Sequence, residues 1–241
     1  MYRDLIEGLR DFRTRYFCTH ADLFERLAHG QKPGVLFITC SDSRIDPNLM
    51  FQAELGELFV IRNAGNIVPP YGAANGGEGA TIEYALRGLN IQDIVICGHS
   101  HCGAMKGLLK LDHLEQEMPL VYEWLQHTQA TRRYLLDRYG DRHDAEMVEL
   151  AVQENVLTQL ENLRTYPEVQ SRLRQGKLNL YGWVFEIETG LVFAYDPAQR
   201  QFLPIDNAAI ACPAPAPPRP LAGPWAARTH LPRPTGRNGV G

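Results

Sequence analysis

The sequence predicts an α/β fold, with a mostly parallel central sheet flanked by helices, an N-terminal helical arm, a C-terminal hairpin and a disordered tail. Three short runs, at residues 34–40, 58–62 and 93–98, are apolar and rich in β-branched residues. Such runs are typical of strands that are covered on both faces of a parallel sheet. Helical patterns separate and follow them, which favours right-handed strand–helix–strand crossovers.

The N-terminal arm is expected to be helical over residues 1–30, because Leu5, Leu9 and Phe12 recur at helical spacing. An amphipathic arm of this kind either folds back on its own chain or crosses to a partner subunit. A second helix is expected at residues 80–89, between the second and third strands.

The rest of the chain up to its tail is predicted to be helical and then to end in a hairpin. Residues 114–175 are largely helical in pattern, and Pro167 interrupts them. Residues 179–185 and 191–195 alternate as strands do, and Gly190 suits the turn between them.

Composition divides the chain into a main domain at 1–206 and a tail at 207–241. The 241 residues are 44% hydrophobic, enough for one sizeable core. Eight of the 16 prolines lie in the tail, which cannot bury enough apolar surface to order itself. The tail carries four arginines and no acid, whereas the remaining 20 basic and 28 acidic residues give the main domain a charge of −8.

These charges and patterns exclude several classes of protein. The net charge of −4 argues against nucleic-acid binding. No run approaches the roughly 20 apolar residues of a membrane span, and the N-terminus lacks a signal-peptide core, so we expect a cytoplasmic protein. Five scattered cysteines are a poor disulfide framework and indicate buried thiols, metal ligands or catalytic groups.

Two predicted strands end in reactive residues, in the sequences CSDSR (40–44) and GHSHCG (98–103). The carboxyl ends of parallel strands meet at one edge of the sheet, so both clusters can line one crevice. Two thiolates and an imidazole suit Zn²⁺, and three protein ligands leave one position open for water. Spacing alone leaves plain packing as an equal alternative. It also leaves His101 as an alternative ligand to His99, and it favours a core position for Cys97.

These two motifs, in this order and spacing, resemble the signature of the β-class carbonic anhydrases. Residues 56–66 match the family as well, and the similarity as a whole covers essentially residues 1–200. The resemblance implies zinc-dependent, reversible hydration of carbon dioxide to bicarbonate, in which a zinc-bound hydroxide attacks CO₂. The zinc ligands that it implies are Cys40, His99 and Cys102. The catalytic pair that it implies is Asp42 with Arg44, whose planar guanidinium keeps the carboxylate ionised.

The resemblance also implies an apolar substrate pocket and an assembly of subunits. The residues that match pocket positions of the family are Gln31, Phe59, Ala64, Tyr84 and Gly103. A small apolar gas needs such a pocket with one or two oriented polar groups. The family forms homodimers, or multiples of dimers, whose site takes residues from both subunits, so Gln31 is expected to serve the zinc of the neighbouring subunit.

Within the family, residues 36–48, 73–79, 118–122 and 129–133 look most like the carboxysomal enzymes of cyanobacteria. That similarity implies a place inside the carboxysome and a carboxysome scaffold protein as partner. We interpret the tail at 207–241 as a docking segment for that partner, with a solubilising tail as the alternative. Two other functions stay open, namely a hydrolase of carbonyl sulfide or carbon disulfide on the same scaffold, and a catalytically idle zinc adaptor.

Overall fold

The structure is a computed structural model that describes residues 2–73, 76–140 and 144–205. The chain divides into two compact units; of the described residues, those up to Gly30 belong to the first and those from Gln31 to Ile205 belong to the second. The tail expected at 207–241 lies outside the described residues.

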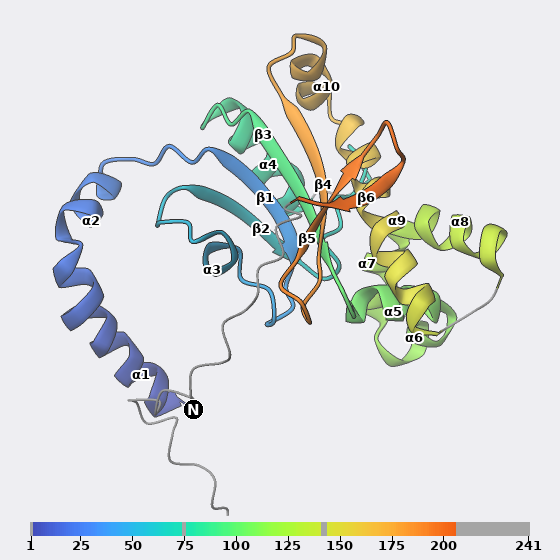
Figure 1. Ribbon diagram of the computed structural model, residues 1–241, viewed down its shortest axis with the longest axis horizontal. Helices are drawn as coiled ribbons and strands as arrows, with labels where there is room; N and C mark the ends of the chain where they lie inside the picture. Colours follow the sequence, from blue (N-terminus) through green and yellow to red (C-terminus); the bar gives the residue numbers. More distant parts are fainter. Residues whose placement is uncertain (1, 74–75, 141–143, 206–241) are drawn as a thin grey trace, which may run out of the picture. The chain divides into compact units, whose positions relative to one another are not determined.

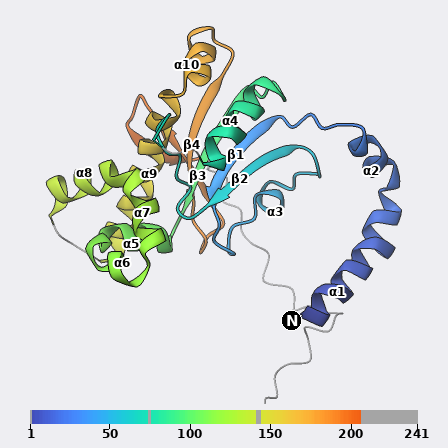
Figure 2. The same cartoon turned by 180° about the vertical axis from the view of Figure 1, so that it is seen from behind.

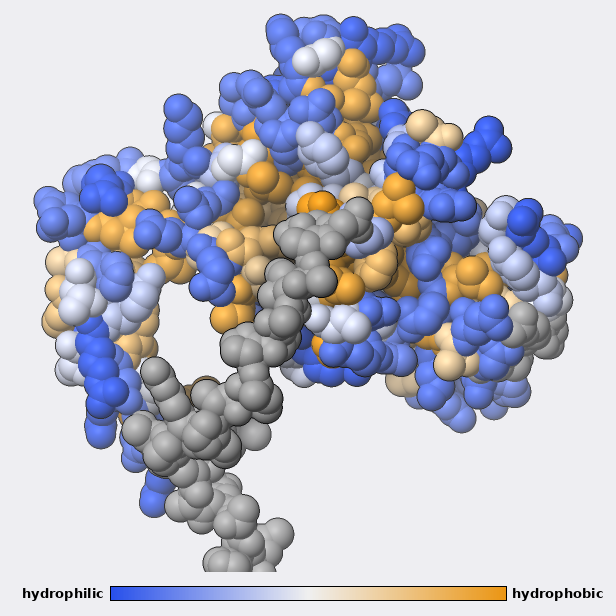
Figure 3. Space-filling view, in the orientation of Figure 1, coloured by the Kyte–Doolittle hydropathy of each residue, from blue (hydrophilic) through white to orange (hydrophobic). Residues whose placement is uncertain are grey.

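The first unit is helical, as its periodicity predicts. It consists of α1 (Tyr2–Asp11), a π-helical segment η1 (Phe12–Phe17) and α2 (Ala21–Ala28), none of which has a buried residue. Rings of the two later elements pack together, with the centroids of Phe17 and Phe24 4.8 Å apart. Apolar and hydrophilic side chains both lie at the surface of this unit (Figure 3). An unburied apolar face of this kind is available for a further packing partner.

The second unit is built on a six-stranded sheet in the order β2-β1-β3-β4-β5-β6 (Figures 1 and 2). The strands are β1 (Val35–Cys40), β2 (Leu58–Asn63), β3 (Asp93–His99), β4 (Asn179–Phe185), β5 (Val192–Asp196) and β6 (Gln201–Pro204). The first four pair in parallel, and β4, β5 and β6 pair antiparallel. The predicted parallel sheet and closing hairpin are therefore confirmed, and β6 is an additional strand that the sequence pattern did not indicate.

Helices follow and cover these strands. They are α3 (Pro47–Phe51), α4 (Gly77–Arg87), α5 (Gly103–Leu109), α6 (Leu111–Glu117), α7 (Pro119–Leu125), the 3₁₀ turn η2 (Gln126–Thr128), α8 (Gln129–Tyr139), α9 (Ala145–Arg164) and α10 (Pro167–Arg174). The helical character predicted for 114–175 is confirmed for its described residues, 114–140 and 144–175. Pro167 occupies the first turn of α10, where its missing N–H leaves no unmade helical bond. Among the described helices, none has the length and apolar character that a membrane crossing requires.

The core lies on both faces of β1 and β3, as their continuous apolar runs predict, whereas β2, at the edge of the sheet, is only partly buried and exposes Val60. On one face Leu36, Ile38 and Ile96 pack in the large cluster that includes side chains of α4, α5 and α9. On the other face Phe37 and Cys97 belong to a smaller cluster that the side chains of α3 border. Cys97 is thus the core residue that its position in the strand indicates.

Helix α9 approaches the sheet closely because glycines face it. A Cβ atom on Gly98 would stand 2.9 Å from Cγ1 of Val152, and one on Gly182 would stand 2.9 Å from Cγ1 of Val156. These distances are shorter than van der Waals contact, so a side chain at either glycine would push α9 away from β3 and β4. The close packing brings α9 to the edge of the sheet where β1 and β3 end.

Candidate metal centre

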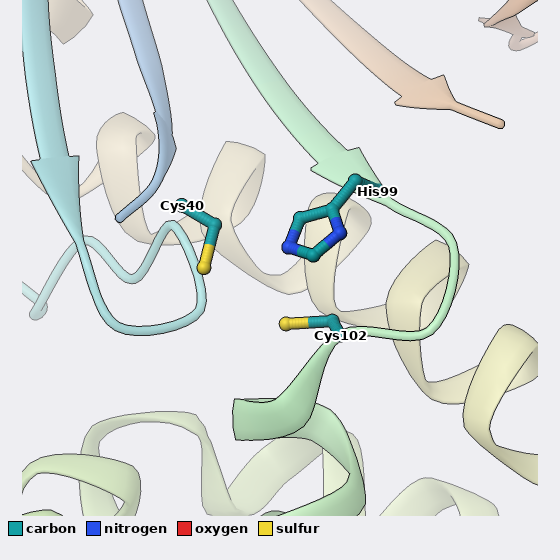
Figure 4. Close-up of side chains that lie close together, drawn as sticks. All are labelled: Cys40, His99 and Cys102. Carbon is teal, nitrogen blue, oxygen red and sulfur yellow. The ribbon is translucent and has the colours of Figure 1, made fainter. Parts of the chain in front are cut away.

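Three side chains converge where two neighbouring parallel strands end. Cys40 is the last residue of β1, His99 is the last residue of β3, and Cys102 immediately precedes α5. Their two sulfurs and an imidazole nitrogen all lie within 4.8 Å of one another, and all three residues are buried (Figure 4). The two clusters that the sequence placed at one edge of the sheet are therefore brought together.

Backbone groups fix the orientation of these side chains. Nδ1 of His99 lies 2.9 Å from the carbonyl oxygen of Ser100, which can only accept, so Nδ1 carries the proton. Nε2 of His99 is buried and has no hydrogen-bond partner among the described residues. The N–H of Gly65 donates to Sγ of Cys40 at 3.4 Å. This arrangement leaves Nε2 and both sulfurs directed at a common point.

The three groups strongly affect one another's protonation. The hydrogen bond from Cys102 lowers the pKa of the Cys40 thiol, although burial acts in the opposite direction. The same pairing with Cys40, together with burial, raises the pKa of Cys102. Burial tends to lower the pKa of His99, but the adjacent Cys40 sulfur, the Ser100 carbonyl and the Asp42 carboxylate together outweigh that effect and raise it. A divalent cation would take the place of the proton that the two sulfurs share.

The donor set fits zinc. Two thiolates and one neutral imidazole are ligands that Zn²⁺ prefers, and an unpartnered buried imidazole nitrogen is otherwise costly. Among the described residues, the candidate metal cluster contains these three side chains and no fourth ligand. Three protein ligands are the pattern of catalytic rather than structural zinc sites.

Asp42 and Arg44 form a bidentate pair beside this cluster. Nε of Arg44 donates to Oδ1 of Asp42 at 2.9 Å, and Nη2 donates to Oδ2 at 2.7 Å. The hydrogen bond from Arg44 holds the pKa of the Asp42 carboxyl well below its usual range, although partial burial opposes it. Oδ2 lies 3.9 Å from Nε2 of His99, so an ionised acceptor lies next to the metal position.

Arg62 supports the loop that carries Asp42, a role that sequence reasoning missed. Its guanidinium donates to three carbonyl oxygens, those of Cys40 at 3.1 Å, Asp42 at 2.7 Å and Ile45 at 2.9 Å. The signal in the sequence was a charged residue near the carboxyl end of an otherwise apolar strand. The N–H of Gly65 was also missed, because a backbone donor leaves no signal in the residue type.

The predicted pocket residues fall into two groups in the chain. Ala64 directly follows Asn63, the register partner of Cys40, and Gly103 begins α5 next to Cys102, so both lie at the metal cluster. Both residues are exposed and can line an approach to it.

The other three predicted pocket residues lie toward the opposite ends of the strands. Phe59 pairs with Leu36 near the start of β1, four residues and about 13 Å along the strand from the level of Cys40. The ring of Tyr84 lies 6.0 Å from that of Phe59, and Gln31 precedes β1. Within one chain these residues therefore lie apart from the Cys–His–Cys cluster.

Comparisons with known proteins agree with this geometry. The family model described as carbonic anhydrase matches residues 35–192. A carbonic anhydrase of Synechococcus elongatus is 62% identical over 211 residues, which cover 88% of this chain and 78% of that protein.

Solved structures show the same fold. That of the β-carbonic anhydrase CcaA has 61% identity and a TM-score of 0.83, and the match covers 84% of this chain and 98% of that one. A structure of the tetrameric β-carbonic anhydrases of the ascomycete Sordaria macrospora has 28% identity and a TM-score of 0.72, covering 80% and 95%. The chain thus belongs to the carbonic anhydrase family and is an enzyme of its β class.

Proposed function

We propose that this carbonic anhydrase binds one Zn²⁺ per subunit through Cys40, His99 and Cys102, and that Asp42 and Arg44 are its catalytic pair. The observation that carries the proposal is the buried convergence of two sulfurs and an unpartnered imidazole nitrogen within 4.8 Å. Bound zinc would supply the Lewis acidity that makes water nucleophilic near pH 7.

Asp42 would orient the nucleophile. As an ionised carboxylate it can only accept, so a water or hydroxide at the site would donate to Oδ2 and turn a lone pair toward the carbon of CO₂. Arg44 occupies both carboxylate oxygens, which restricts the rotation of the side chain. Asp42 and Arg44 would therefore act by orienting the nucleophile, and the metal would supply its reactivity.

The test is metal analysis of freshly purified protein together with stopped-flow CO₂ hydration. We expect about one zinc per chain and loss of turnover on chelation, with recovery when zinc is restored. Full turnover in metal-free protein would refute the proposal. Carbonyl sulfide and carbon disulfide, assayed in parallel, identify the hydrolase alternative, and zinc without CO₂ turnover identifies the idle adaptor.

The substrate pocket is proposed to form between subunits. Ala64 and Gly103 would line it from the chain that holds the zinc, and Gln31, Phe59 and Tyr84 would come from a second copy. The separation of these two groups along the strands of one chain supports this assignment. The Sordaria macrospora relatives, which are tetrameric, support assembly in general.

We further propose that the enzyme works inside carboxysomes and supplies CO₂ to the carbon-fixing enzyme there. The cyanobacterial relative at 62% identity supports this location. Residues 207–241, which are basic and rich in proline, would bind a carboxysome scaffold protein through Trp225 and their spaced arginines. A chain ending at Asp206 should keep its CO₂ hydration but lose co-localisation with carboxysomes, and a truncated chain that still co-localises would rule out docking through the tail.

A further inference from the structure

His101, which lies in the sequence between the proposed zinc ligands His99 and Cys102, has a left-handed backbone conformation. Its φ angle is +55°, a region that residues other than glycine seldom occupy and that costs roughly 1 kcal/mol or more. The residue is followed directly by Cys102. Surrounding contacts must therefore hold this conformation if Cys102 is to point at Cys40 and His99.

Contacts from three elements hold it. Oε1 of Glu149, on α9, accepts the backbone N–H of His101 at 2.9 Å. Nη2 of Arg44 donates to the carbonyl oxygen of His101 at 3.2 Å. Nε2 of the His101 ring contacts the carboxylate of Glu188, in the turn between β4 and β5.

The contact with Arg44 connects this loop to the catalytic pair. The same Nη2 atom that donates to the His101 carbonyl also donates to Oδ2 of Asp42. A change in the His101 backbone would therefore move a partner of Arg44 and, through the next peptide bond, Cys102. Glu149 contacts His101 through the backbone N–H and, at 3.7 Å, through Nδ1 of the ring. Its hydrogen bond therefore links α9 to the loop that carries Cys102 and to the partner of Arg44.

We propose that Glu149 is a positioning residue. Its carboxylate oxygen holds His101 in the left-handed conformation and thereby places both Cys102 and the Arg44–Asp42 pair. The proposal rests on the zinc and Asp42 assignments made above and adds to them a residue on α9, 48 positions along the chain from the backbone N–H that it binds.

The first test compares three variants at two positions of α9. Glu149→Ala should lower kcat/KM for CO₂ hydration and speed zinc release to a colorimetric chelator, each about tenfold, as is usual when a partner behind the metal ligands is lost. Glu149→Gln keeps an oxygen acceptor and should stay within about twofold of the wild type in both measurements. Glu161→Ala, on the same helix and 76% exposed, is the matched control and should change neither. Thermal unfolding of all three variants checks that they fold.

The second test separates positioning from a direct effect of charge. Glycine adopts a left-handed conformation without steric cost, so in a His101→Gly background Glu149→Ala should have little further effect on either measurement. His101→Asn, which also tolerates this conformation, is the alternative background if the glycine variant folds poorly.

Three results would overturn the proposal. These are a Glu149→Ala variant that matches Glu161→Ala, an equal loss in Glu149→Gln, and a tenfold effect that persists in the His101→Gly background. Failure of the underlying assignment would look different, because wild-type protein would then release no zinc or Asp42→Asn would keep full turnover.

Discussion

At the level of single residues, the most consequential side chain is Asp42, which accepts three hydrogen bonds from one neighbour. Two come from the guanidinium of Arg44 and the third from its backbone N–H, at 3.0 Å from Oδ1. A carboxylate with this many donors is held both ionised and in one orientation. Arg44, two positions away in the sequence, thus keeps the Asp42 carboxylate ionised and fixes its orientation.

Replacing Asp42 by Asn should lower kcat/KM about 100-fold and leave the zinc content near one per chain. The amide has nearly the same shape, but its NH₂ group would face the donors of Arg44 or the nucleophile. Stopped-flow hydration and metal analysis on the same sample measure the two effects. Asp137→Asn, which removes an exposed carboxylate paired with Arg133, is the control and should change neither. Wild-type turnover in Asp42→Asn would contradict the role proposed for this carboxylate.

At the level of secondary-structure elements, an ion-pair network joins α10 to α4. Glu168 accepts from Nε of Arg172 at 3.0 Å and pairs with Nη2 of Arg87 at 2.8 Å. Arg172 also donates to the carbonyl oxygen of Leu86 at 2.6 Å. The hydrogen bond from Arg172 is the main cause that lowers the pKa of Glu168, with Arg87 adding to it against partial burial.

The stability of this network should depend on pH in a defined direction. Because the pKa of Glu168 is lower in the folded state, the network stabilises the fold above the unfolded-state value of about 4.3 and loses that effect as pH falls further. Glu168→Gln should therefore reduce the free energy of unfolding at pH 7, by about 0.5–1 kcal/mol, and have a smaller effect near pH 3. Urea unfolding at both pH values measures the difference. Glu161→Gln, whose pair with Arg164 is largely exposed, should have little effect at either pH. An effect of Glu168→Gln that grows on acidification would show that the sign is wrong.

At the level of the whole molecule, the central question is whether a catalytic site draws residues from two chains. Two variant chains can answer it. One has a lesion in the predicted pocket residues, Gln31→Ala together with Tyr84→Ala, and the other has a lesion beside the zinc ligands, Asp42→Asn. If the groups come from different chains, a mixed dimer has one site with both lesions and one with neither. If they come from the same chain, every site of a mixed dimer has one lesion.

Co-expression of these two variants should therefore restore activity that neither has alone. Equal, random pairing would leave about a quarter of all sites intact, so we expect about a quarter of wild-type turnover. The control mixes each variant with itself under the same conditions. No recovery in dimers shown to contain both chains would place Gln31 and Tyr84 in the site of their own chain, or outside any site.

The sequence by itself was sufficient for the parallel sheet and for the family, and the resemblance to that family singled out the three side chains that converge at the candidate metal centre. Continuous apolar runs can be read locally, because strands buried on both faces need such residues at every position. Cys40 and His99 end two of those runs, so the rule that the carboxyl ends of parallel strands meet brings them together without coordinates. The pairing of Asp42 with Arg44 spans two residues and is equally local.

Only the tertiary structure decided the contacts between distant segments. The short strand β6 has no distinctive pattern and exists because β5 offers an edge to pair with. The hydrogen bonds of Glu149 to His101 and of Gly65 to Cys40 connect residues 48 and 25 positions apart through backbone N–H groups, which every residue except proline possesses. The separation of Phe59 from the level of Cys40 likewise follows from strand register. Residue types report local preferences, whereas register, left-handed backbone and backbone donors depend on how the whole chain packs.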